Sequence, residues 1–208
     1  LQAVKQSSYA LQYVEVENQT EEIFSKQTQS VLLAAVRQNG VTVSYVKNQT
    51  EEICSKHTEN VLLAAVQQDG LSLKFINNQT EDICIAAVKQ NGYSLQYVLD
   101  QTRKIFSKQT QSVLLAAVEQ NGFALRCVHV TNQTEEICIS AVKQNGLALK
   151  YVKNQTIEIC FEAVQQNGLA LKYVKNQTRD ICFEAVGQNQ DANKYIKITI
   201  IFKKSARN

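Results

Sequence analysis

The sequence predicts an all-α protein, an α-solenoid of about seven stacked short helical hairpins. The first indication is a recurring phrase, an Ala-Val pair followed by two or three polar residues and usually Asn-Gly. A fixed period of about 20 to 50 residues is typical of stacked repeats, because one unit is too small to bury its own apolar face. The second is the absence of proline from all 208 residues, which agrees with a helical chain. The seven pairs are Ala35-Val36, Ala65-Val66, Ala87-Val88, Ala117-Val118, Ala141-Val142, Ala163-Val164 and Ala185-Val186.

The distances between these pairs reduce to a 22-residue unit. Counted from a partial copy at Ala3-Val4, the spacings are 32, 30, 22, 30, 24, 22 and 22 residues, and insertions of eight or two residues explain the longer ones. The two-residue insertions lie in Val14–Asn18 and Val128–Asn132. We expect each eight-residue insertion, such as Glu51–Thr58, to add a short extra helical turn before the main helix, with Ile53 as its apolar anchor. A two-turn extension of the main helix is the alternative.

The first helix of each unit is predicted from an apolar stripe. In the unit Asn154–Lys175, the stripe is formed by Ile159, Cys160, Ala163 and Val164 at positions i, i+1, i+4 and i+5. Six Asn-Gln-Thr triplets match the glycosylation acceptor, but we interpret them as helix caps in which Asn or Thr accepts hydrogen bonds from the first amides of the next helix. Asn-Gly should end the helix, with the glycine in a left-handed conformation that costs other residues about 1 kcal/mol.

The second helix of each unit is predicted to be short, about two turns. In Leu169–Lys175, we expect Leu169, Tyr173 and Val174 on one side and the lysines elsewhere. The Gln-Asn pairs that precede the second helices, from Gln38-Asn39 to Gln166-Asn167, would line up along the stack. We interpret them as structural residues that bond neighbouring turns.

The six cysteines are interpreted as core residues rather than as disulfide partners or metal ligands. Four of them occupy a repeat position where other units have leucine, Cys54 stands where others have phenylalanine, and Cys127 stands where others have tyrosine. Cys127, His129 and Cys138 are the nearest approach to a metal-binding set, but they lack paired ligand spacing. The four leucine-equivalent cysteines are Cys84, Cys138, Cys160 and Cys182.

Two phrases carry a resemblance to a known family. Val61–Phe75 (VLLAAVQQDGLSLKF) and Asn132–Cys138 (NQTEEIC) resemble a short helical repeat of unknown function that is abundant in giant amoeba viruses of the mimivirus type. The resemblance extends to about Asn189. It implies helical repeats and a viral setting, but it supplies no catalytic or binding residues.

The predicted organisation is a repeat solenoid over residues 1–189 and a divergent C-terminal cap or tail over residues 190–208. The tail segment Tyr195–Lys204 either forms a strand or replaces the second helix of the last hairpin, with Ile198 and Phe202 packed inward. No apolar run is long enough to suggest a membrane span. The chain starts within a repeat and contains no methionine, so we expect it to be part of a longer protein.

The expected function is a non-enzymatic scaffold that binds another protein, because no nucleophile, phosphate-loop or metal motif is present and no cofactor is expected. The host cytoplasm, the virus factory or the virion is the expected location. Residues that differ between units are the candidates for partner contact, although neutral drift is an equal explanation. These candidates are Arg37, Gln67, Lys89, Tyr93, Glu119, Phe123, Arg126, His129, Lys143 and Gln165.

The alternative function is binding to a nucleic-acid backbone along a basic ridge on the second helices. A net charge of only +3, and acidic residues that recur as regularly at the starts of the first helices, argue against it. The ridge residues are Lys74, Arg126, Lys150, Lys172 and Lys175.

Overall fold

A computed structural model describes residues 6–7, 26–45, 56–98 and 108–197 of the chain. Over these residues it contains seven units, each an α-helix followed by a 3₁₀-helix, and one additional short 3₁₀-helix, η7 (Val130–Asn132). The units are α2 (Lys26–Gln38) with η2 (Gly40–Tyr45), α3 (Lys56–Gln68) with η4 (Gly70–Phe75), α4 (Glu81–Gln90) with η5 (Gly92–Tyr97), α5 (Lys108–Gln120) with η6 (Gly122–Cys127), α6 (Glu135–Gln144) with η8 (Gly146–Tyr151), α7 (Ile157–Gln166) with η9 (Gly168–Tyr173), and α8 (Arg179–Gln188) with η10 (Gln190–Tyr195).

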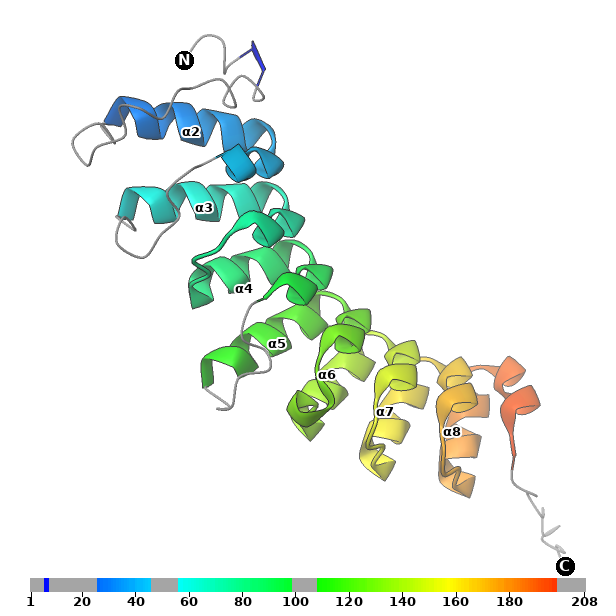
Figure 1. Ribbon diagram of the computed structural model, residues 1–208. Helices are drawn as coiled ribbons and strands as arrows, with labels where there is room; N and C mark the ends of the chain where they lie inside the picture. The colour runs from blue at the N-terminus through cyan, green and yellow to red at the C-terminus, as the bar shows by residue number, and fades with distance from the viewer. Residues whose placement is uncertain (1–5, 8–25, 46–55, 99–107, 198–208) are drawn as a thin grey trace, which may run out of the picture.

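The units stack in chain order and form a curved array (Figure 1). The α-helices lie side by side in one layer, and the 3₁₀-helices follow the same order along one edge of it. The main contacts join each α-helix to the next, each 3₁₀-helix to the next, and each α-helix to the 3₁₀-helices of its own and the preceding unit. The predicted all-α solenoid is therefore confirmed.

The apolar stripe predicted for the α-helices forms the core. In α7 the buried residues are Ile159, Cys160, Ala163 and Val164, as the spacing indicated. The same four positions are buried in α4 and α6. Each α-helix therefore contributes one stripe to an apolar layer that runs through the whole described stack.

The second element of each unit is a 3₁₀-helix, which corrects the expected helix of two ordinary turns. In η9, Gly168, Ala170 and Leu171 are buried, while Leu169 and Tyr173 are only half-buried. Val174, the C-cap residue that follows η9, is also buried. A 3₁₀-helix has three residues per turn, so Gly168 and Leu171, three residues apart, lie on one face of η9. The predicted shared face of Leu169, Tyr173 and Val174 was wrong, because it assumed the wider turn of an α-helix.

The glycine of each Asn-Gly pair also differs from the prediction. Gly168 has no left-handed backbone, and the turn is made by Asn167, which has extended dihedral angles of φ −154° and ψ 108°. Asn167 ends α7, and its Oδ1 accepts a hydrogen bond from the N–H of Leu169 at the start of η9. A Cβ atom on Gly168 would lie 2.2 Å from the carbonyl oxygen of Ala185 in α8. Glycine is required here because the next unit approaches too closely for a side chain.

The eight-residue insertions lengthen the α-helices by about one turn. Helices α2, α3 and α5 have 13 residues, while α4, α6, α7 and α8 have 10. In α3 the three additional residues, Lys56–Thr58, are continuous with the main helix, so the expected separate turn is not found in this part of the insertion. Ile53 lies outside the described residues.

Glutamines at two repeat positions form hydrogen bonds between neighbouring units of the described chain. The first is the last residue of the α-helix: Gln166 Oε1 accepts a hydrogen bond of 2.6 Å from the N–H of Gly146 in the preceding unit. Equivalent bonds, of 2.5 to 2.8 Å, join Gly40 to Gln68, Gly70 to Gln90, Gly92 to Gln120, Gly122 to Gln144 and Gly168 to Gln188. The predicted bonding of neighbouring turns by the Gln-Asn pairs is confirmed for the glutamine, while the asparagine caps its own unit.

The second glutamine belongs to the Asn-Gln-Thr triplet. Gln155 Nε2 donates to the carbonyl oxygen of Tyr173 at 3.0 Å, and Gln155 Oε1 accepts from the N–H of Lys175 at 3.0 Å. Gln79, Gln133 and Gln177 make the same link across 18 residues. The triplet caps the next helix as predicted, and its threonine rather than its asparagine is the cap: Thr156 Oγ1 accepts a hydrogen bond from the N–H of Ile159.

Four of the cysteines lie in the core, as predicted. Cys84, Cys138, Cys160 and Cys182 are buried, and Cys160 Sγ donates a weak hydrogen bond to Gln155 Oε1 at 3.6 Å. Burial raises the pKa of all four thiols, to about 11 for Cys84 and Cys138, whose pKa values are also raised by Glu81 and Glu135, respectively. Cys127 is half-buried, and Cys54 lies outside the described residues.

We expect these four buried thiols to resist alkylation in the folded protein at pH 8. The thiolate is the reactive nucleophile. A raised pKa lowers the fraction of thiolate, and burial limits the access of the reagent to the sulfur. Iodoacetamide labelling followed by peptide mass spectrometry should show Cys127 modified well before them, with all five modified at similar rates in urea. Equal rates for Cys127 and Cys138 without urea would contradict the prediction. Because the folded-state pKa lies above the ordinary value of 9.0, stability should also fall as pH rises from 9.0 toward 11.

The last 3₁₀-helix, η10, occupies the place of a second element although its sequence differs from the others. Gln190 replaces the usual glycine and is exposed, and no described α-helix follows α8 to approach it. The second element of the last unit is therefore Gln190–Tyr195, and the segment Tyr195–Lys204 does not replace it as one alternative expected. Residues 198–208, with Ile198 and Phe202, lie outside the described residues, so the strand, the inward packing of these two side chains and the boundary at residue 189 stay predictions.

Candidate functional site

One row of candidate partner-binding residues is aligned along the layer of α-helices. Each of these residues immediately precedes the glutamine that ends its α-helix, and all are exposed. The row contains both charges and neutral side chains, and in α8 it ends at Gly187. Its members are Arg37, Gln67, Lys89, Glu119, Lys143 and Gln165.

An apolar row that the sequence analysis missed runs beside them. It lies four residues before the variable position in every α-helix, and therefore on the same face. Six members are half-buried, and Phe183 is 51% exposed. The signal was available, because an apolar residue follows the cysteine or leucine core position in every unit, but the helix was assigned a single stripe. The members are Leu33, Leu63, Ile85, Leu115, Ile139, Phe161 and Phe183.

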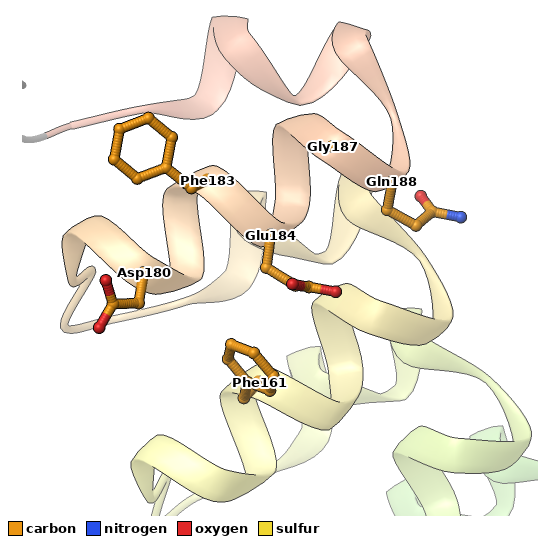
Figure 2. A pocket seen from close by; sticks show the side chains of 6 residues that line it. All are labelled: Phe161, Asp180, Phe183, Glu184, Gly187 and Gln188. Atoms are coloured by element: carbon orange, nitrogen blue, oxygen red, sulfur yellow. The ribbon is translucent and has the colours of Figure 1, made fainter.

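Two open hollows lie on this face at equivalent positions of different units. One, of about 550 Å³, is lined by Phe161 of α7 and by Asp180, Phe183, Glu184, Gly187 and Gln188 of α8. Figure 2 shows Phe161 extending from α7 toward α8, while Phe183 projects from α8 on the other side. The other hollow, of about 480 Å³, is lined by Leu63 and Gln67 of α3 and by Asp82, Ile85, Ala86, Lys89 and Gln90 of α4.

The predicted basic ridge is only partly a single row. Lys74, Arg126, Lys150 and Lys172 are exposed at the same position of η4, η6, η8 and η9, and Lys194 extends the row in η10. Gln96 interrupts the row in η5, and Ser44 has this position in η2, before the first cation. Lys175 lies in the loop after η9, where its Nζ donates to the carbonyl oxygen of Lys153 at 2.7 Å. The structure therefore separates Lys175 from the other four ridge residues.

The cations of this row lie over aromatic rings. The Arg126 guanidinium is 4.7 Å from the ring centre of Tyr93 in the preceding unit. A hydrogen bond to Cys127 raises the pKa of Arg126 above its ordinary value. Lys150 Nζ lies 4.9 Å from Phe123 and 4.6 Å from Tyr151. Such contacts are favourable because the positive charge lies over the electron-rich face of the ring. Tyr93, Phe123 and Arg126 therefore belong to the 3₁₀ edge and not to the α-helical face.

The comparison with family models extends over more than half of this array. The model described as "Domain of unknown function (DUF4116)" matches residues 58–103, 134–178 and 156–200. The chain belongs to the DUF4116 family. The last two matches start 22 residues apart, which is one unit of the stack. Neither a curated protein nor a solved structure matches the chain.

The remaining predicted residue of this DUF4116 chain, His129, has a local structural contact. It lies in the two-residue insertion before η7, where its Nδ1 is 2.9 Å from Thr131 Oγ1 and accepts from the Thr131 N–H at 3.4 Å. Within the described ranges, no group of three His, Cys, Asp or Glu side chains could hold a metal ion. No helix in the same ranges has the length and apolar character needed to cross a membrane.

Proposed function

We propose that this DUF4116 chain is a non-enzymatic repeat scaffold that binds another protein along its α-helical face, within a giant virus or its infected host cell. The observation that carries the proposal is the half-exposed apolar row, from Leu33 to Phe183, beside the row of variable residues. Apolar contacts supply binding energy, and the polar residues around them set specificity. The viral setting rests on the sequence resemblance.

The geometry of the face supports this proposal. Solenoids present extended surfaces because every unit repeats the same orientation. Here the residues that hold the stack, such as Gly146 and Gln166, are used for contacts between units. The side chains of the variable row are exposed and differ between units, while the six half-buried side chains of the apolar row pack partly against the core and keep part of their surface accessible.

The proposal is tested by affinity capture from host and infected-cell lysates, with and without nuclease. The informative variant is Lys89→Glu with Glu119→Lys, which exchanges two exposed charges on adjacent helices and leaves the net charge unchanged. The control, Lys150→Gln with Lys172→Gln, changes the 3₁₀ edge. We expect a nuclease-resistant protein that the wild type and the control retain and the α-face variant loses. Failure to capture any nuclease-resistant protein, or equal loss with both variants, would contradict the proposal.

Polyanion binding is a second candidate because Arg126, Lys150, Lys172 and Lys194 project from four consecutive 3₁₀ positions of the described chain. This candidate predicts retention on a single-stranded polynucleotide that falls steeply with salt. Removing two phosphate contacts with Lys150→Gln and Lys172→Gln should reduce the slope of log affinity against log salt by about 1.4. An unchanged slope would exclude the 3₁₀ edge as the binding surface.

A further inference from the structure

The two hollows on the α-helical face differ in charge although they occupy equivalent positions. At the sixth helix position, Glu184 of the α8 hollow replaces Ala86 of the α4 hollow. At the ninth position, Gly187 replaces Lys89. The α4 hollow therefore contains one carboxylate and one ammonium group, while the α8 hollow contains two carboxylates and no cation.

The wider surface around the α8 hollow is also acidic. Helices α7 and α8 contain four carboxylates and one cation, Arg179. Glu162 forms an ion pair with Lys143 of α6, with 3.4 Å between Nζ and Oε1. Across the described residues, neither Asp180 nor Glu184 is in an ion pair. The carboxylates are Glu158, Glu162, Asp180 and Glu184.

The same hollow contains Phe183, the most exposed residue of the apolar row. Phe183 is 51% exposed, whereas the other members of that row are half-buried. Gly187 has no side chain and no atom within 4 Å of where a Cβ would be, so it leaves the hollow open on the side of the variable row. Two rings therefore flank a helix face that carries two carboxylates (Figure 2).

We propose that the hollow of Phe161, Asp180, Phe183, Glu184 and Gly187 is the docking site for a basic amphipathic segment of a partner protein. Apolar side chains of the segment pack on the two phenylalanine rings, and its lysine or arginine residues pair with Asp180 and Glu184. This inference rests on the proposed function and names the chemistry of its partner. Charge complementarity selects the occupant, because an acidic or neutral segment would leave the two carboxylates facing its apolar side chains without a counter-charge.

The test uses the full chain and a fluorescein-labelled 16-residue helical peptide with leucine along one face and arginine on both flanks of that face. We expect saturable binding, measured by fluorescence anisotropy, that weakens at least tenfold with Gly187→Lys, which installs the cation found in the α4 hollow. Gly187→Ala should bind within twofold of wild type. Asn60→Lys, an exposed site on α3, controls for the added positive charge and should also bind within twofold. A peptide with glutamate in place of arginine should not bind.

Several outcomes would overturn the proposal. Equal weakening by Asn60→Lys and Gly187→Lys would mean that net charge alone drives binding. Concentration-dependent dimerisation that Gly187→Lys abolishes would assign the hollow to a second copy of the chain. Binding by Lys203→Glu with Lys204→Glu but not by the wild type would assign it to the C-terminal tail. If the peptide fails while lysate capture still depends on Lys89 and Glu119, the scaffold function stands and only this partner chemistry is wrong.

Discussion

Replacing Gly146 with alanine is expected to destabilise the protein by about 3 kcal/mol, at the upper end of the usual cost of overpacking. The new Cβ would lie 2.3 Å from the Ala163 carbonyl oxygen and 3.1 Å from the Asn167 Cβ, both in the next unit. Ala163 is on the buried side of α7, so its carbonyl can move away only if α7 moves with it. Urea unfolding followed by circular dichroism measures the change.

Two further substitutions make this prediction specific. Gly187→Ala, in the last turn of α8, should raise stability by about 0.4 to 1 kcal/mol, because nothing obstructs its Cβ and alanine has less conformational freedom than glycine in the unfolded chain. Gly146→Asn should destabilise at least as strongly as Gly146→Ala. If Gly146→Asn were the milder change, a left-handed backbone rather than close packing would explain the glycine.

Replacing Gln155 with methionine is expected to cost about 2 kcal/mol, the range for leaving buried or partly buried polar groups without partners. The amide donates to the carbonyl oxygens of Leu149 and Tyr173, at 3.5 and 3.0 Å, and accepts from the N–H of Lys175 at 3.0 Å. Methionine has a similar size but makes none of these bonds, so the ends of η8 and η9 lose their link. Thermal unfolding by differential scanning calorimetry provides the measurement.

The matched control is Gln165→Met in the same unit. Gln165 is exposed on α7, and the change should alter stability by less than about 0.5 kcal/mol, as is usual for surface positions. The outcome that contradicts the prediction is an equal, small effect of both substitutions. That result would mean that water replaces the Gln155 amide at little cost.

The sequence was sufficient to predict the structural role of residues that recur in the repeat and have a clear chemical function. Ile159, Cys160, Ala163 and Val164 follow helical spacing, and cysteine exchanges with leucine between units, so both the stripe and the core position of Cys160 could be deduced. The threonine caps followed from their position before an apolar stripe. These inferences needed only local spacing, which is why they were correct.

The errors arose where the decisive contact is between units. Gly168 stands next to Asn167 in a way that is typical of a left-handed helix end, and only the position of Ala185 shows why glycine is needed. The role of Gln155 was equally hidden, because Tyr173 is 18 residues away. The 3₁₀-helix η9 has six residues between its caps, Asn167 and Val174. The spacing of apolar residues in so short a segment does not distinguish a 3₁₀-helix from an α-helix.

For the candidate surface, the sequence predicted which residues are exposed better than it predicted how they are arranged. Identical repeat positions placed Lys89 and Glu119 in one row, since the register of each unit is the same. Lys175 was grouped with Lys172, but a three-residue separation places one in the 3₁₀-helix and the other in the following loop. The apolar row was missed because Phe161 lies directly beside the core position Cys160, and the sequence alone does not show which of the two is deeper.

The glutamine bonds have a consequence for how such a chain changes in length. Gln166 reaches only to Gly146 in the adjoining unit, and Gln155 joins only the ends of η8 and η9. An in-frame duplication or deletion of 22 residues therefore creates a junction that uses the same donors and acceptors as the junctions already present. The number of units can vary in whole steps without redesign of the core, and each step extends the α-helical face by one helix.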